Sequence, residues 1–360
     1  MIRSKLIKWL KWGLACCMLV PFLAWQAKDT SFQPTDTKGF IAEMQKQFAE
    51  VQTIKKKENH REELERKVRD THRMLMHDYP VYYDWWLQDG NDAKDIKDGK
   101  DVNWFRGSFS RQLSLRMQKL NITAAVNDTP ESIEAAFQSY LKACERRRAE
   151  RLETFTANQP EIVFTKFRTL RPSFFAYTEG VSDARAECNY FAGGSLSKIK
   201  MNGIWAEEET LLTDEDGVYR DPNLHFDGQH LLFSWKKSAK DDDFHLYEMD
   251  LKTRAVKQLT FGKGHADIEG IYLPDENILF NSTRSGSAVD CWFTEVSNMY
   301  LCDREGRYMR QVGFDQVHTT TPTLLDDGRV VYTRWDYNDR GQVWAQPLFQ
   351  MNPDGTGQAE

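Results

Sequence analysis

The sequence predicts a protein of the α+β class, in which a helical N-terminal region is followed by an incomplete β-propeller of four-stranded blades. The main observation is a pattern that occurs three times between residues 221 and 354: a short apolar segment, an acidic turn, and a β-rich segment that ends in an aromatic residue. The turn residues Asp227, Asp275 and Asp327 are 48 and 52 residues apart. This spacing is typical of a four-stranded propeller blade and is too short for a βαβ unit with its neighbours.

The second hairpin of each blade also recurs. The segments 245–260 and 298–312 match each other, and a third version begins at residue 348. A first blade, enlarged by an insert, is expected over 161–213. A closed propeller leaves no open blade edge, whereas this sequence contains three blades and the start of a fourth. We therefore expect the blades at 160–360 to belong to a fragment of a longer protein.

Residues 1–27 are predicted to be a signal peptide. Four basic residues precede an apolar run at 12–25, which is too short to span a bilayer comfortably. We therefore expect an exported protein, periplasmic or extracellular, with no transmembrane span after signal removal. Cys16 and Cys17 follow Leu14-Ala15, which partly matches the pattern of a lipoprotein attachment site, so lipid attachment is an alternative.

Residues 28–159 are predicted to be helical, because apolar residues recur there at steps of three and four. The clearest helix begins at Thr129, which is placed to cap it, with Pro130 in the first turn. Its apolar face is expected to be core, with Cys144 as a small buried residue. This face consists of Ile133, Ala136, Phe137, Tyr140, Leu141 and Cys144.

An aromatic cluster at 79–87 precedes a polar segment at 88–101. Buried, it would seal helices together, which is the interpretation we favour because aromatic side chains contribute strongly to cores. Exposed, Tyr82, Trp85 and Trp86 could stack on sugar rings, as in a carbohydrate-binding protein. Burial of these rings would dismiss that alternative.

The blade residues resemble the TolB-type, WD40-like propeller repeat, in which an aspartate–glycine turn joins two strands. More closely, the segments 326–340, 351–357 and 192–196 resemble exported bacterial proteins related to the hydrazine synthase alpha subunit. The resemblance covers roughly residues 160–360 and implies the fold. In hydrazine synthase the chemistry belongs to c-type haems in domains after the propeller, and the CxxCH attachment motif is absent from this sequence.

The predicted function is therefore an exported binding or scaffolding protein for an unknown protein or small-molecule ligand. The alternative is the propeller portion of a haem-dependent oxidoreductase subunit, which CxxCH motifs beyond Glu360 would favour. The sequence has no Gly-rich phosphate loop, GxSxG or HExxH motif. The residues present therefore favour a protein without catalytic activity, and as an enzyme this chain would be unconventional. No cofactor is evident, and haem is expected only if downstream domains carry it. The net charge of -6 and pI of about 5.8 give no reason to expect nucleic acid.

A ligand or metal site is predicted where the chain enters the inner strands of the blades, because these loops converge at one mouth of a propeller. Counting back from the turn aspartates places Asp221, Glu269 and Thr321 at one equivalent position. The imidazoles and carboxylates of the predicted site could bind a divalent metal or an oxygen-rich ligand. The alternative is that they solvate the mouth or cap turns. The candidates are Asp221, His265, Asp267, Glu269 and His318.

A second charged cluster at 334–340 is either a binding loop or an internal network of arginine with aspartate. Its candidate residues are Arg334, Trp335, Asp336 and Arg340. Export also permits disulfides. Cys291 and Cys302 flank an expected hairpin or loop, and they form either a disulfide or two unpaired thiols.

Overall fold

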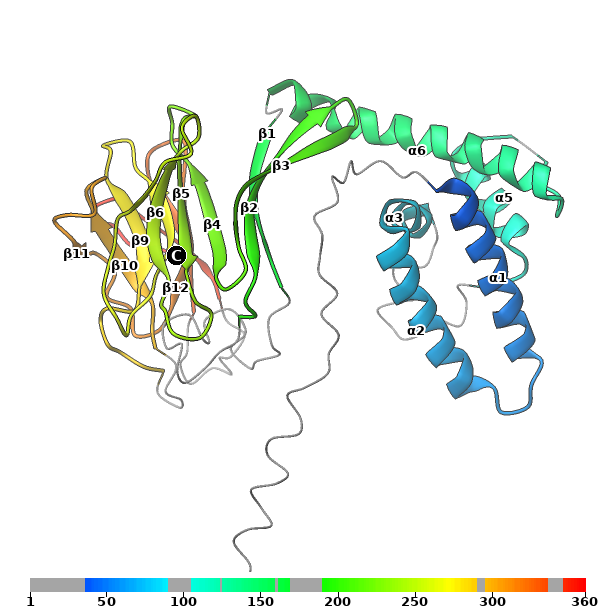
Figure 1. The fold of residues 1–360 in the computed structure, drawn as a ribbon, viewed down its shortest axis with the longest axis horizontal. Helices are drawn as coiled ribbons and strands as arrows, with labels where there is room; N and C mark the ends of the chain where they lie inside the picture. The colour runs from blue at the N-terminus through cyan, green and yellow to red at the C-terminus, as the bar shows by residue number, and fades with distance from the viewer. Residues whose placement is uncertain are drawn as a thin grey trace, which may run out of the picture.

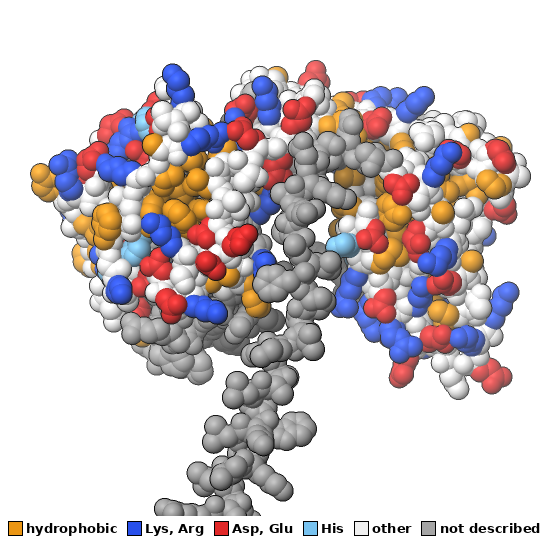
Figure 2. Space-filling model, viewed as in Figure 1, with side chains coloured by type: hydrophobic (Ala, Val, Ile, Leu, Met, Phe, Trp, Pro, Cys, Tyr) orange, Lys and Arg blue, Asp and Glu red, His pale blue; other side chains and the backbone are white. Residues whose placement is uncertain are grey.

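The protein is α+β and has a helical part beside a series of β-sheets, as Figure 1 shows. The computed structural model describes residues 36–89, 105–123, 125–158, 161–168, 190–289, 295–335 and 346–360. Among the helices in these ranges, none has the length and apolar character needed to cross a membrane. On the viewed face, acidic and basic side chains are interspersed over both the helical part and the sheets (Figure 2).

The helices of the N-terminal part pack around one apolar core. Their bounds are α1 Thr37–Lys55, α2 Arg61–Asp78, α3 Pro80–Asp89, α5 Phe109–Lys119 and α6 Pro130–Asn158. As predicted, the hydroxyl of Thr129 accepts a hydrogen bond from the N–H of Ser132, 3.3 Å away, at the start of α6. The core contains Phe40, Val51, Leu75, Tyr83, Leu113, Phe137 and Cys144, all fully buried.

The aromatic cluster for which the sequence allowed either burial or exposure lies on α3 and is buried in this core. The side chains of Tyr82, Trp85 and Trp86 are 4%, 2% and 1% exposed. The favoured interpretation is therefore confirmed, and these rings are not available to stack on a sugar.

Beyond the helices, the described residues fold into four antiparallel sheets of three or four strands. Each sheet is formed by strands that are consecutive in sequence, so every connection within a sheet joins neighbours. The sheets are β1 Glu161–Phe167, β2 Gly194–Asn202 and β3 Trp205–Asp214; β4 Val218–Leu224, β5 His230–Lys236, β6 His245–Asp250 and β7 Val256–Gln258; β8 Asp267–Tyr272, β9 Ile278–Ser282, β10 Asn298–Cys302 and β11 Arg310–Gln311; and β12 Thr319–Leu324, β13 Val330–Arg334 and β14 Leu348–Met351.

Consecutive sheets pack face to face. Their first strands are in contact in sequence order, β1 with β4, β4 with β8, and β8 with β12. Residues that alternate along a strand face opposite neighbours: Leu231 and Phe233 of β5 pack toward the first sheet, and Leu232 packs toward the third. The second and third sheets are therefore apolar on both faces.

A β-bulge interrupts the first strand of the second, third and fourth sheets at the same place. The strand register shifts between Arg220 and Asn223, between Ile268 and Ile271, and between Thr320 and Thr323. The first residue of each bulge has a left-handed backbone, and these are the three residues that the sequence placed at one equivalent position. They are Asp221 (φ 54°), Glu269 (φ 56°) and Thr321 (φ 51°).

The second residue of each bulge is a proline or a glycine, which fits a place where the hydrogen bonds between strands are interrupted. Pro222 and Pro322 lack the backbone donor that a regular strand would use, and proline is tolerated at bulges for this reason. The third sheet has Gly270 there, where a Cβ would lie 2.8 Å from a methyl carbon of Leu232. A glycine thus allows the second and third sheets to approach closely.

The tip of the β2–β3 hairpin joins the sheets to the helical part, as Figure 1 shows near α6. The Trp205 ring lies 5.9 Å from the Trp85 ring of α3, between centroids. Arg148 of α6 donates from Nε to the carbonyl oxygen of Ile204, 2.7 Å away, and its guanidinium lies over the Trp205 ring. The hairpin therefore extends the helical core.

The bulges lead to a prediction about stability. Thr321 is β-branched, exposed and left-handed, a conformation that costs such a residue about 1–2 kcal/mol. We expect Thr321→Gly to raise the free energy of unfolding by about 1 kcal/mol, because glycine adopts this conformation freely. Urea denaturation followed by circular dichroism measures the change.

The matched control is Thr323→Gly, two residues along the same strand, where the backbone pairs regularly with Val331. Glycine there weakens the strand and should lower the free energy of unfolding by about 1 kcal/mol. A loss of stability of similar size in both variants would contradict the assignment of strain to Thr321.

Candidate functional site

The first candidate site lies at the bulges of β4 and β8, where the structure brings Asp221 and Glu269 together. Oδ2 of Asp221 accepts a hydrogen bond from the backbone N–H of Glu269, 3.1 Å away. Arg220 ties the two carboxylates together: its Nε lies 2.6 Å from Asp221 Oδ2, and its Nη2 lies 3.3 Å from Glu269 Oε1. Arg220 also donates to the Tyr190 hydroxyl at 2.9 Å.

Glu269 continues the same linkage to the fourth sheet. Its Oε2 accepts from the backbone N–H of Thr321 at 2.7 Å and from Nδ2 of Asn281 at 2.8 Å. The carboxylate of each bulge thus binds the backbone N–H of the next bulge. Burial and the neighbouring charge of Asp221 raise the pKa of Glu269, while Arg220 opposes the rise. The cluster joins three sheets through groups that satisfy one another.

Asp267 and His265 lie near the start of β8 and have other partners. Asp267 is fully buried, and its carboxylate accepts from Arg284 Nη2 at 2.6 Å and from the Ser282 hydroxyl at 2.7 Å. Burial opposes its ionisation, but the hydrogen bonds from His245 and Arg284 lower the pKa of Asp267. His265 is half-buried, with Nε2 3.2 Å from the carbonyl oxygen of Phe261.

His318 is fully buried beside Trp335, and the two rings stack with centroids 5.6 Å apart. Its Nδ1 accepts a hydrogen bond from the N–H of Ser297 at 3.1 Å, so the neutral ring carries its proton on Nε2. Burial lowers the pKa of His318 to about 4. Within the described residues, the five predicted side chains do not form one group of metal-ligand atoms.

The residues of the second predicted cluster are partly described. Trp335 is 3% exposed. Arg334 lies over the Phe349 ring, 3.8 Å from its centroid, and its Nη1 is 3.3 Å from Oδ1 of Asp315. The other two candidates of this cluster, Asp336 and Arg340, lie outside the described residues.

Cys302 is a free cysteine, buried in the apolar layer between the second and third sheets. Burial raises the pKa of its thiol to about 12. Cys291, the other residue of the predicted disulfide, lies outside the described part of the chain.

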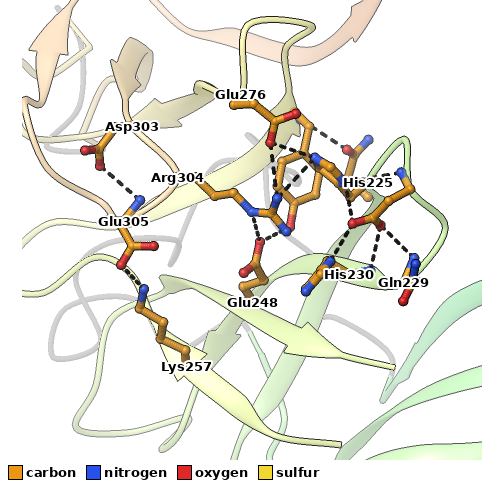
Figure 3. Close-up of polar contacts among 12 residues, drawn as sticks. His225, Gln229, His230, Glu248, Lys257, Glu276, Asp303, Arg304 and Glu305 are labelled. Carbon is orange, nitrogen blue, oxygen red and sulfur yellow. Dashed lines mark hydrogen bonds and ion pairs between the residues drawn. The ribbon is translucent and has the colours of Figure 1, made fainter. Parts of the chain in front are cut away.

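The sequence analysis missed another group of polar residues, at the turn between β4 and β5 (Figure 3). His225, Asp227 and His230 each offer one ligand atom, and these atoms lie within 4.8 Å of one another. Within the described ranges, no other three histidine, cysteine, aspartate or glutamate side chains bring their ligand atoms this close together. The spacing His-x-Asp-x-x-His is visible in the sequence, but Asp227 also matches the turn aspartates Asp275 and Asp327, which hides it among the residues of the repeat.

The sequence matches no protein-family model, and it matches none of the curated proteins. Similar solved structures include TolB from Acinetobacter baumannii, at 19% identity and a TM-score of 0.35, covering 46% of this chain and 37% of that one. Another is the hydrazine synthase of Kuenenia stuttgartiensis, at 15% identity and a TM-score of 0.43, covering 55% of this chain and 31% of that one.

A third is a putative TolB from Agrobacterium tumefaciens, at 18% identity and a TM-score of 0.34, covering 47% of this chain and 60% of that one. The neighbours thus include the TolB-like and hydrazine synthase structures named in the sequence resemblance. In each comparison this chain spans less than two thirds of the other protein, and the likeness concerns the fold alone.

The burial of His318 predicts a pH dependence of stability. Its pKa is about 4 in the folded chain, against about 6.5 when unfolded. Between pH 4 and 6.5 this histidine is protonated in the unfolded chain but neutral in the folded chain. Its contribution to the free energy of unfolding is therefore fully present above pH 6.5 and is lost as the pH falls toward 4. The loss from this group is about 3 kcal/mol.

We expect His318→Asn, which keeps an acceptor for the Ser297 N–H, to remove this part of the pH dependence. Urea denaturation of the two proteins at pH 7, 6, 5 and 4 measures the difference. Parallel curves for the two proteins across this range would contradict the assignment.

Proposed function

We propose that the four sheets are consecutive blades of an incomplete TolB-like β-propeller, and that the chain is an exported module that binds a protein partner. The order of contacts among first strands and the apolar layers between sheets support the blade arrangement. In the part of the chain that the structure describes, β1 and β12, the first strands of the outermost sheets, do not pack against each other as neighbouring first strands do. The basic and apolar sequence of residues 1–27 supports export.

The observation that carries the binding role is a pair of exposed phenylalanines at equivalent positions. Phe261 follows β7 and Phe314 follows β11, and they are 63% and 77% exposed. The backbone before them is the same in both sheets. The N–H of Leu259 donates to Leu246 O, and the N–H of Val312 donates to Met299 O. Both phenylalanines therefore lie in loops that enter the next first strand, at one end of the sheets.

Both loops are held in place, which favours binding. The carbonyl oxygen of Phe261 accepts from Arg284 Nη2 at 3.1 Å. Asp315, next to Phe314, donates its N–H to Asn298 Oδ1 at 2.7 Å and accepts from Asn298 Nδ2 at 3.0 Å. An aromatic side chain on a fixed loop loses little conformational freedom when a partner covers it, and aromatic residues are enriched at protein interfaces.

The helical part fits a scaffolding role within the same function. Its core is continuous with the β2–β3 hairpin through Trp205. A partner bound at the ends of the sheets would thus be held at a fixed position relative to the helices.

A photo-crosslinking experiment tests this function. In cells of the organism that makes the protein, p-benzoylphenylalanine is placed at position 261 or 314, and at position 308 as a control. Tyr308 is 82% exposed but lies in the β10–β11 turn rather than in an entry loop. We expect the same partner to be crosslinked at 261 and 314 and not at 308.

The double variant Phe261→Ser/Phe314→Ser should also reduce recovery of that partner by about tenfold or more, since each aromatic anchor contributes about 1–2 kcal/mol or more. Tyr308→Ser should leave recovery unchanged. If the double variant recovers the partner as well as the unmodified chain does, or if crosslinks form only at position 308, the loops that carry Phe261 and Phe314 are not the binding surface.

A further inference from the structure

We propose that His225, Asp227 and His230 bind one divalent transition-metal ion of the zinc type. The site lies at the turn between β4 and β5, and it involves none of the phenylalanines of the proposed partner surface. The proposal therefore stands independently of the function proposed above.

The two imidazoles converge on one carboxylate oxygen. Oδ2 of Asp227 lies 2.7 Å from Nδ1 of His230 and 3.0 Å from Nδ1 of His225. Two nitrogens and one oxygen suit zinc, whose bonds of about 2.0–2.1 Å place tetrahedral ligands roughly 3.3 Å apart. Asp227 and His230 are partly exposed, so modest rotation would let the three atoms surround an ion and leave a fourth position for water.

The carboxylate of Asp227 is already oriented for this role. Its other oxygen, Oδ1, accepts from the backbone N–H groups of Gln229 at 2.7 Å and of His230 at 3.2 Å. Oδ2 is therefore the oxygen that faces the histidines, and the turn fixes its direction.

His225 has the arrangement expected of a ligating histidine. The N–H of Asp227 lies 3.2 Å from its Nδ1, and in the tautomer that accepts this hydrogen bond Nδ1 carries the lone pair and Nε2 carries the proton. Nε2 lies 3.2 Å from Oε2 of Glu276, to which it can donate. Ligating histidines commonly donate their second nitrogen to a carboxylate, and that carboxylate is itself hydrogen-bonded. Arg304 Nη1 fills this last role, 3.1 Å from Glu276 Oε2 (Figure 3).

The charge of the network favours a cation. Asp227, Glu276 and Glu248 contribute three carboxylates, and Arg304 is the guanidinium that pairs with the two glutamates. With neutral histidines the group carries an excess of negative charge, which a divalent ion at Asp227 would balance. The ion would lie on the Nδ1 side of His225, whereas Arg304 approaches from the Nε2 side.

The other sheets provide an internal comparison. The N–H groups of His225, Leu273 and Leu325 close the turns of the second, third and fourth sheets by donating to the carbonyl oxygens of His230, Asn277 and Arg329, and the first of these turns is one residue longer than the other two. The position of His225 is thus occupied by leucine in the third and fourth sheets. A buried imidazole, 6% exposed, stands where the repeat otherwise has an apolar residue. Leucine at this position makes the same closing hydrogen bond, in turns that are one residue shorter.

The experiment uses the full chain, freed of metal with a chelator and titrated with Zn²⁺ alone by calorimetry. A parallel titration with Co²⁺ reports tetrahedral coordination through its visible absorption. We expect one ion per chain. The variant His225→Leu/His230→Asn places here the leucine and asparagine that make the closing hydrogen bond of the third-sheet turn. We expect it to fold while binding at least about 100-fold more weakly. Glu276→Gln, which changes an exposed side chain, should weaken binding about tenfold.

Two single variants serve as controls. His77→Ala removes an exposed histidine whose Nδ1 lies 2.7 Å from the Asp78 carboxylate, a His–Asp pair with no second histidine. His265→Ala removes a histidine predicted at the channel mouth. Both should bind Zn²⁺ as the unmodified chain does. Circular dichroism melts establish that each variant is folded.

The proposal is overturned if the unmodified chain binds no Zn²⁺, or if His225→Leu/His230→Asn binds it as the unmodified chain does. It is also overturned if His77→Ala or His265→Ala accounts for the binding, because the ion would then be held elsewhere. If the double variant does not fold, unchanged affinity in Glu276→Gln together with normal affinity in His230→Asn gives the same negative answer.

Discussion

The hydrogen bonds from bulge carboxylates to the backbone of the next sheet are the constraint on which the β part depends. A bulge leaves a residue unpaired in the ladder, and a buried N–H without a partner costs about 1–3 kcal/mol. Asp221 satisfies the N–H of Glu269, and Glu269 satisfies the N–H of Thr321. The strain of three left-handed residues is thus offset by bonds that also fix the distance between first strands.

This constraint determines where the other features lie. The first strands are held in register with one another, so the loops that enter them and the turns that leave them repeat from sheet to sheet. Phe261 and Phe314 are equivalent for that reason. So are the turns at Asp227 and Asp275, which brings Glu276 of the third sheet to within 3.2 Å of His225 in the second. The sheet spacing therefore assembles the polar network between two turns.

Much of this organisation could be predicted from the sequence, and the failures have physical causes. Counting from the turn aspartates correctly aligned Asp221, Glu269 and Thr321, since the period of the repeat is also the period of the bulge. It could not reveal that the partners of these side chains are backbone N–H groups, because a bulge leaves no mark in the pattern of apolar residues. His318 faces Trp335 in the interior, and sequence position alone does not distinguish a buried histidine from one at a channel mouth.

The metal-ligand group was missed for a different reason, which also indicates how such sites can be found. A search for repeats weights the residues that the copies share, and these residues build the fold. His225 is a departure: a buried polar ring in place of leucine costs free energy unless its nitrogens are paired. Here both nitrogens of His225 face carboxylates, and leucine makes the corresponding closing hydrogen bond in the turns of the next two sheets. A buried polar residue that replaces leucine in a repeat, and whose nitrogens face carboxylates, is the kind of residue for which a binding role is the simplest explanation.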